Sequence, residues 1–234
     1  EEWFAKDIPP PPLDNDELRA AVGWCRVHWC TDHPLHGPIK GWDVSNVTNM
    51  SGLFLRWQSL PSWSYDSNFT YNIDISEWKV GEVTDMSHMF ERADRFNADV
   101  SEWDVSSVRN MQCMFKSAGS FNQDLSKWKI RNVTSMIGMF RNAFEFNSPL
   151  FAVDTECEVS DMDSMFSRAP KFNQDLSHWD LSRVISMKSM FADCTMFNSP
   201  VFRIGKLPGC ELLTRTMHFC PFASSPARAR CGMF

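Results

Sequence analysis

The 234-residue sequence lacks several features that assign proteins to common functional classes. No apolar run reaches about 18 residues, so we expect no transmembrane helix. There is no run of Lys or Arg, and the formal net charge is -6, which argues against a nucleic acid or an anionic membrane as the partner. Only 10 glycines occur, and no glycine-rich phosphate loop, G-x-S-x-G or H-E-x-x-H motif is present. We therefore expect no enzyme, no catalytic residue and no cofactor.

Residues 25–36 are the one stretch that suggests a metal site, with two Cys and three His. Their spacing matches no common zinc pattern, and we predict no metal. Packed residues of a terminal cap, or a disulfide from Cys25 or Cys30, explain the stretch better.

An internal repeat of about 25 residues organises the chain. Residues 78–96, 103–121 and 128–146 read WKVGEVTDMSHMFERADRF, WDVSSVRNMQCMFKSAGSF and WKIRNVTSMIGMFRNAFEF. The Met that opens each M-x-x-M-F element recurs at Met50, Met86, Met111, Met136, Met162 and Met187. A repeat of this length indicates a stacked array, because one such unit cannot bury its apolar side chains alone.

The repeat predicts a solenoid with short parallel β-strands and short helical or 3-10 turns. We place a strand at each V-x-x-M and a helical turn after each Met-Phe pair. An Ile/Val/Leu position precedes the Trp column and includes Leu150, while Val153 takes the Trp position of its coil. The Met column is expected to be core.

A column of Asn residues follows the second Phe of each repeat. Its members are Asn97, Asn122, Asn147, Asn173 and Asn198. We interpret it as a structural ladder in which the amides bond the backbone of adjacent coils. The alternative is a set of solvent-facing turn residues with local bonds.

Four segments follow from this pattern. We expect residues 1–12 to form a Pro-rich extended arm that carries Trp3 and Phe4 as candidate docking residues; the alternative is an ordered tail that tethers nothing. Residues 13–36 are expected to form an N-terminal helical cap. Residues 37–204 form the solenoid of about six or seven coils, and residues 205–234 form a C-terminal cap.

The first repeat interval contains an insertion at residues 55–68. It brings Trp57, Trp63 and Tyr65, with Tyr71 just beyond it. Inserted loops protrude from a solenoid, and exposed Trp and Tyr anchor interfaces, so these four residues are candidate partner-binding residues. The alternative is a loop folded over its own aromatic cluster. Outward positions of the strand row add Asp85, Arg109 and Lys188.

Eight cysteines are compatible with an oxidising compartment. Five lie near the ends of the chain and are disulfide candidates: Cys25, Cys30, Cys210, Cys220 and Cys231. We expect a secreted, cell-surface or organelle-lumen protein.

The unit MFERADRFNADVSEWDVSSVRNMQCMF resembles the BspA-like leucine-rich-repeat family of surface proteins, long described as a domain of unknown function, over about residues 37–198. The opening helix followed by HGPIKGWDVSNVTNM is similar to the versions found in unicellular algae. The resemblance implies a right-handed, leucine-rich-repeat-like solenoid with a parallel sheet on one face. It also implies adhesion and protein contacts, and it brings no catalytic residues.

Three functions remain open at this point. The first is a non-catalytic protein–protein interaction or adhesion module whose partner is another protein or protein complex. The second is a fixed accessory subunit of a larger assembly, such as a membrane-associated complex in an algal organelle. The third is a carbohydrate-binding surface protein that stacks sugars on the aromatic loop.

Overall fold

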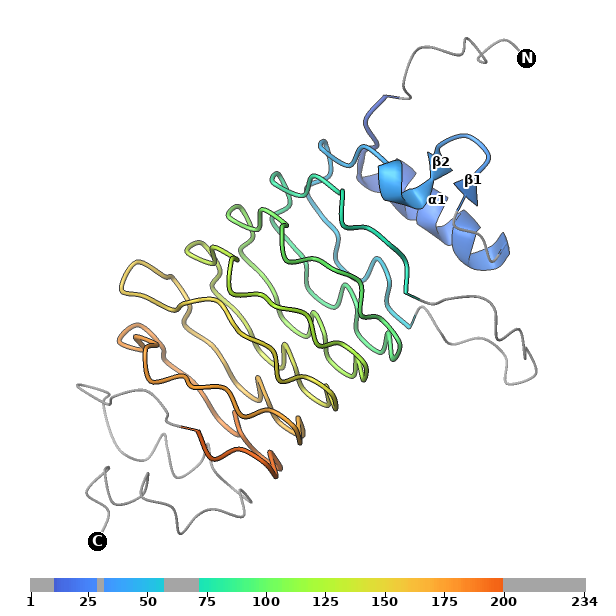
Figure 1. The fold of residues 1–234 in the computed structure, drawn as a ribbon. Coiled ribbons are helices and arrows are strands. Elements are labelled where there is room, and N and C mark those ends of the chain that lie inside the picture. The colour runs from blue at the N-terminus through green and yellow to red at the C-terminus, as the bar shows by residue number, and fades with distance from the viewer. Residues whose placement is uncertain (1–10, 29–31, 57–71, 200–234) are drawn as a thin grey trace, which may run out of the picture.

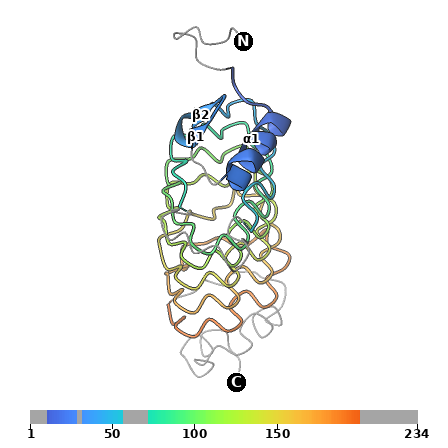
Figure 2. The same ribbon diagram turned by 90° about the vertical axis from the view of Figure 1, so that its right-hand side faces the viewer.

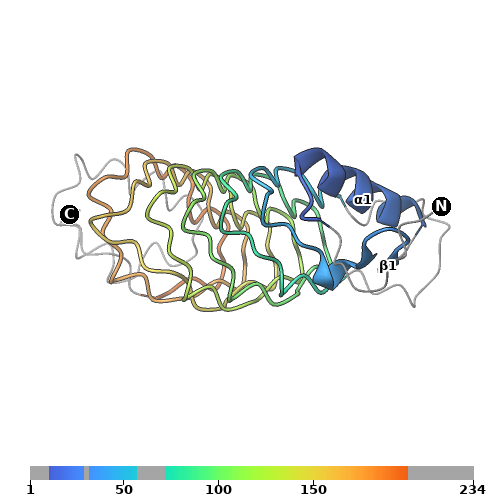
Figure 3. The same ribbon diagram turned by 90° about the horizontal axis from the view of Figure 1, so that it is seen from above.

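The computed structural model describes residues 11–28, 32–56 and 72–199 (Figure 1). The chain begins with a helix and a small hairpin and then winds into successive coils that lie side by side along one axis (Figures 1 and 3). The long axis is also evident after a quarter turn (Figure 2). We call this region the coil stack. None of the helices in the described ranges is long and apolar enough to span a membrane.

Helix α1, Asn15–His28, follows the prolines and starts with a reciprocal cap. The Asp14 Oδ1 atom accepts the N–H groups of Asp16 and Glu17 at 2.9 and 2.8 Å, and the Glu17 Oε2 atom accepts the Asp14 N–H at 3.0 Å. Such caps satisfy donors that the first helical turn leaves open. The strands β1, Asp32–His33, and β2, Gly37–Pro38, pair antiparallel, and the 3-10 helix η1 spans Ile39–Gly41.

Helix α1 covers the open end of the first coil and imitates a preceding coil. The Asn15 Oδ1 atom accepts the N–H groups of Thr48 and Asn49, both at 3.0 Å. The Arg19 guanidinium donates to the Ser51 carbonyl at 2.9 Å. In the next coil the Ser87 carbonyl is bonded instead by the N–H of Gly52. Side chains of α1 therefore replace backbone bonds that only another coil could make.

Parallel bridges tie the coils together, between residues 36 positions apart across the insertion and 25 or 26 positions apart elsewhere. Five isolated bridges join one residue of each coil to the next, in the series Asn49, Asp85, Asn110, Ser135, Asp161 and Ser186. These bridges are single-residue contacts, so the described coils carry no extended parallel strand.

Each coil has one turn within its M-x-x-M element and a second turn after the Met-Phe pair, and neither is the helical turn that the sequence predicts after that pair. The Met89 N–H bonds the Met86 carbonyl, and the Ala93 N–H bonds the Phe90 carbonyl. The third residue of each turn has positive φ, 58° at His88 and 61° at Arg92, which is the pattern of a type II turn. The reason is the neighbouring coil: the N–H groups of Met86, His88, Phe90 and Arg92 all bond carbonyls of the next coil at 2.7–3.0 Å. A helical turn would direct these donors along its own axis.

Aromatic columns fill the interior. The first Phe of each coil stacks on its equivalent in the next coil, with ring centroids 5.4–5.8 Å apart from Phe54 to Phe191. Within a coil the second Phe lies against the first, as in Phe115 and Phe121 at 3.8 Å. Burying one such side chain contributes roughly 1.5–3 kcal/mol. The opening Met side chains are fully buried beside these columns.

The Trp column is interrupted in the coil that contains Val153. From Trp78 onward the other indole N–H groups each donate to a carbonyl of the preceding coil, as Trp128 does to Val100 at 2.9 Å. The Trp42 indole donates instead to the Gly37 carbonyl of β2 at 3.0 Å. Val153 is buried in the Trp position. The preceding apolar position is filled by Phe151, which is fully buried and bonded by Trp179, whereas Leu150 is only partly buried. The assignment of Leu150 was wrong by one residue, because the Ser-Pro sequence and an extra residue shift the local frame.

Candidate functional site

The strand row is the line of outward residues beside the bridges, from residues 48–49 to residues 185–188. Arg109 and Lys188, both predicted partner-binding residues, are exposed. Thr84 and Thr134 are also exposed, so this row offers side chains to solvent in every coil. The most exposed apolar member is Ile185, at 77%.

Asp85, the third predicted residue of the row, is half-buried and folded back on its own turn. Its Oδ1 atom accepts the Ser87 N–H at 2.8 Å. Asn110 and Asp161 make the same bond to the residue two positions later, at 3.1 and 3.0 Å. Asp85 therefore holds a turn through its Oδ1 atom, which reduces what it can offer to a partner.

In the fourth coil the bridge position is Ser135, whose side chain does not bond the N–H two residues later. Its Oγ atom is buried without a hydrogen-bond partner. In the described part of the chain, no bond to the Ile137 N–H replaces the missing carboxylate or amide. This coil therefore carries a local polar defect.

An ion-pair cluster lies on the turns next to the strand row. The Glu91 carboxylate bonds the His88 Nδ1 atom at 2.6 Å and the Lys116 Nζ atom at 2.9 Å. Burial acts to raise the pKa of Glu91, but the bonds to His88 and Lys116 outweigh it and hold that pKa below its usual value. Cys113 lies in the same turn position as His88, and burial raises the pKa of its thiol, so it is an unreactive core thiol.

The Asn column forms the predicted contacts. The Asn97 N–H donates to the Asn72 Oδ1 atom at 2.8 Å, and the same bond recurs at Asn122, Asn147, Asn173 and Asn198 at 2.7–2.8 Å. These side chains are exposed or half-buried, so the ladder runs along the surface of the stack. Its role is structural.

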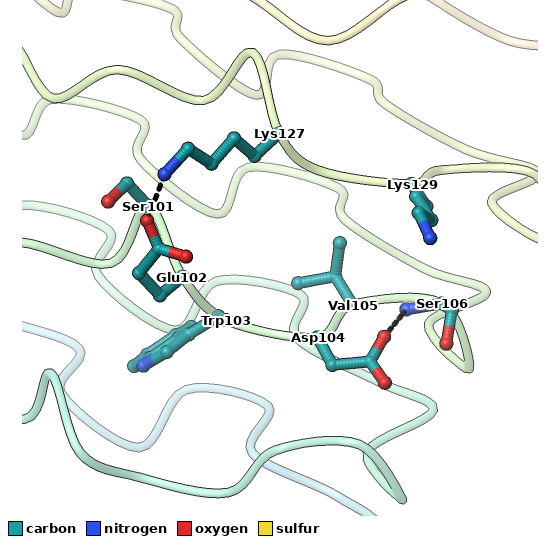
Figure 4. Close-up of a pocket in the computed structure, with 8 residues that line it drawn as sticks. All are labelled: Ser101, Glu102, Trp103, Asp104, Val105, Ser106, Lys127 and Lys129. Carbon is teal, nitrogen blue, oxygen red and sulfur yellow. Dashed lines mark hydrogen bonds and ion pairs between the residues drawn. The ribbon is translucent and has the colours of Figure 1, made fainter.

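The Trp-side face comprises the connections that follow the Asn column in each coil, namely residues 40–46, 74–82, 99–107, 124–132, 152–158 and 175–183. It carries a shallow hollow of about 310 Å³ lined by Glu102, Asp104, Lys127 and Lys129 (Figure 4). A second hollow of about 500 Å³ adjoins it where the Trp column is interrupted, beside Ala152 and Cys157. Lys127 pairs with Glu102, so the charges lining the first hollow offset one another.

Aspartates of the Trp-side face serve the backbone. The Oδ1 atom of Asp104 accepts the Ser106 N–H at 3.0 Å, and Asp99, Asp124 and Asp180 bond the N–H two residues later in the same way. Hydrogen bonds from both the side chain and the backbone N–H of the serine two residues later keep the pKa of each aspartate below its ordinary value. Bonds from Lys40 and then Ser76 lower the pKa of Asp74 to about 2. Repeated, identically bonded acids are not an acid–base pair.

The histidines after α1 pack as aromatic side chains. His33 is buried against Trp24 and His36, with centroids 4.9 and 4.7 Å away, and burial followed by the neighbouring His36 lowers its pKa. Across the described ranges, no three His, Cys, Asp or Glu side chains are grouped to hold a metal ion. Cys25 is buried on the inner face of α1.

Several predicted residues lie outside the described residues. They are Trp3, Phe4, Cys30, Trp57, Trp63, Tyr65, Tyr71, Cys210, Cys220 and Cys231. Most of the Pro-rich arm and the whole C-terminal cap lie outside as well. The inserted-loop site and the disulfides therefore stay predictions.

Sequence reasoning missed the two residues that follow each Met-Phe pair. The structure places them on a common edge, and they include Arg92 and Arg141, both exposed. In five coils one of the two residues is Lys or Arg, but which of the two varies from coil to coil. A search for a fixed column or a Lys/Arg run therefore does not find this line of cations. Counting charge over both positions together would have found it.

Comparison with known proteins identifies a family and little else. Neither the curated proteins nor the solved structures contain a match to the chain. A family match does cover residues 29–62, 59–159 and 150–205, which is most of the chain and includes the whole coil stack. The chain therefore belongs to the family described as Mycoplasma protein of unknown function, DUF285.

Proposed function

We propose that the coil stack is a leucine-rich-repeat-like solenoid of the BspA-like type and that it acts as a non-catalytic protein-interaction module. The partner binds along the strand row, where Arg109 and Ile185 offer different chemistry at equivalent places and Lys188 adds a cation in the coil of Ile185. Adhesion at a cell surface or assembly in an organelle lumen both use such a module.

The observation that supports this proposal is a contrast within one repeat frame. Interior positions keep one residue type from coil to coil, as the fully buried opening Met side chains do. The residue two before that Met is instead Thr48, Thr84, Arg109, Thr134, Ser160 or Ile185. Packing fixes the inner set, since each coil must fit the same neighbour. Packing leaves the outer set free, and a partner gives a reason for its differences.

Ile185 is the sharpest case. An Ile that is 77% exposed contributes nothing to the core and is accessible to a partner. Lys188 is exposed three residues later. The last described coil of the strand row therefore carries an exposed apolar side chain and an exposed charged one.

Site-specific photocrosslinking tests the proposal. A benzophenone amino acid replaces Arg109 or Ile185 in the full chain, which is then illuminated in its native extract. We expect the same discrete protein adduct from both positions. The matched control replaces Glu102 on the Trp-side face and should give no such adduct. Equal labelling from all three positions, or none from the strand row, rejects the strand row as the binding surface.

A further inference from the structure

The turn ridge is a line of paired positions that directly follow the Met-Phe element in each coil. Its members are residues 55–56, 91–92, 116–117, 141–142, 167–168 and 192–193. Each of the first five pairs contains one cation, in the series Arg56, Arg92, Lys116, Arg141 and Arg168. One cation per coil makes a charged line parallel to the axis of the stack.

The acids of the turn ridge are already paired. Glu91 bonds Lys116 at 2.9 Å, and Asp193 bonds the Arg168 Nε atom at 3.2 Å. With five cations and these two acids, the ridge has a formal charge of +3, in a chain whose net charge is -6. Arg92 and Arg141 are exposed and form no salt bridge with any described residue. A positive ridge on an acidic protein concentrates anions locally.

The backbone of the ridge is fixed by bonds between coils. The N–H groups of Arg92, Ser117 and Arg168 donate to carbonyls of the next coil, each at 2.7 Å. Residues 56, 92, 117, 142 and 168 all have φ between 51° and 61°, so the chain bends in the same way in every coil. Hydrogen-bonded neighbours lie about 4.8 Å apart, and the five cations therefore span about 19 Å.

The spacing selects among linear anions. An extended acidic peptide presents side chains on one side only about every 6.6 Å, which drifts out of step with the coils. Duplex DNA carries one charge per about 1.7 Å of axis on a helical path, so few phosphates meet a straight ridge. In a chain of sugar rings with a carboxylate on each ring, successive carboxylates turn to opposite sides, so one side repeats its charge every two rings. That repeat is comparable to the two coils that separate Arg92 from Arg141.

Hydrogen-bonding groups between the cations fit the same class of ligand. Ser117 and Asn142 are half-buried on the ridge, and the Asn142 Nδ2 atom donates to the Ser117 Oγ atom at 3.3 Å. Both retain bonding capacity for sugar hydroxyls. We propose that the turn ridge binds a linear carboxylated polysaccharide along the axis of the stack, separately from the protein partner of the strand row.

Binding of defined oligogalacturonates to the full chain tests this proposal. At low salt we expect affinity to rise with oligomer length until the oligomer spans the ridge, and to fall as salt increases. Changing both Arg92 and Arg141 to Gln should weaken binding about tenfold, as expected for two exposed charge contacts of somewhat under 1 kcal/mol each. The thermal midpoint should not change, because neither side chain forms a salt bridge with the described residues.

The matched control carries Lys127→Gln and Lys129→Gln on the Trp-side face and should bind as the parent does. Neutral dextran should not bind. The proposal fails if the parent does not bind oligogalacturonate, if the two double variants lose affinity equally, or if polyglutamate or duplex DNA binds as tightly as the oligosaccharide. Strand-row crosslinking remains an independent readout, so failure here leaves the proposed protein contact standing.

Discussion

The Trp-side face and the turn ridge are built by the same repeat but use their charged residues differently. The face holds thirteen acids and six cations, whereas the ridge holds two acids and five cations. On the face, aspartates bond backbone N–H groups of their own turns, as Asp124 bonds Ser126 at 2.8 Å. On the ridge, Arg92 and Arg141 extend into solvent without a salt bridge to the described residues. Charged side chains therefore serve the fold on the Trp-side face, whereas on the turn ridge these two cations are exposed.

The largest effect on stability should come from removing a buried Trp side chain beneath the Trp-side face. Trp128→Ala removes a buried ring and the indole bond to the Val100 carbonyl at 2.9 Å, and we expect it to lower the free energy of unfolding by about 3–5 kcal/mol. Trp128→Phe keeps most of the ring and should cost less. Urea unfolding measures both, and a loss below about 1 kcal/mol for the Ala variant would show that the Trp column does not hold the coils.

A smaller change in stability should come from adding a side-chain acceptor for a backbone N–H that lacks one. Ser135→Asn supplies an Oδ1 acceptor to the Ile137 N–H, as Asn110 does for Gln112 at 3.1 Å. We expect the free energy of unfolding to rise by about 0.5–1.5 kcal/mol. The exposed neighbour Thr134, changed to Asn, is the control and should gain nothing. Destabilisation by Ser135→Asn would contradict the assigned role of this position.

Lowering the pH should reduce the free energy of unfolding by protonating aspartates of the Trp-side face. The pKa of Asp74 is about 2 in the folded chain, below its unfolded value, so the folded state binds fewer protons. Its contribution is therefore present above about pH 4 and is lost as the pH falls towards about 2. Asp74→Asn keeps an acceptor for the Ser76 N–H but loses the charge that attracts Lys40.

Since Asp74 and Lys40 are both largely exposed, we expect the variant to lose under about 1 kcal/mol at pH 7. Unfolding curves of variant and parent should converge at about pH 2. A constant difference at all pH values would mean that the charge of Asp74 is not the cause.

The smallest effect should be on the turn ridge. Arg141→Ala removes an exposed cation that forms no salt bridge with the described residues, so we expect a change within about 0.5 kcal/mol. The same urea experiment measures it. A loss similar to that of Trp128→Ala would erase the distinction between the two regions.

Much of this arrangement follows from the sequence, because burial imposes a period that residue types reveal. After the insertion in the first interval, the Met, Phe and Asn positions occur every 25 or 26 residues, and the structure stacks them. The sequence also indicates a helix after the prolines, where α1 lies.

The turns were not predictable because His88 and Cys113 hold a positive φ without being Gly, which gives no local signal. Only Gly52 and Gly138 mark this position in other coils. The shift at Phe151 was missed because an extra residue has no fixed place in a repeat frame. The turn ridge was missed because its cation changes position between coils.

The central claim is that equivalent residues of successive coils are immediate neighbours, and a disulfide between engineered cysteines tests it most directly. Arg109 and Thr134 are both exposed, and the Thr134 N–H bonds the Arg109 carbonyl at 2.8 Å. Cysteines at 109 and 134 should form a disulfide rapidly on mild oxidation, seen by peptide mass spectrometry, because bonded neighbours lie about 5 Å apart. Cysteines at 109 and 160 lie two coils apart, about 10 Å, and should not. No link in the first pair, or equal linking in both, would contradict the stacked coils.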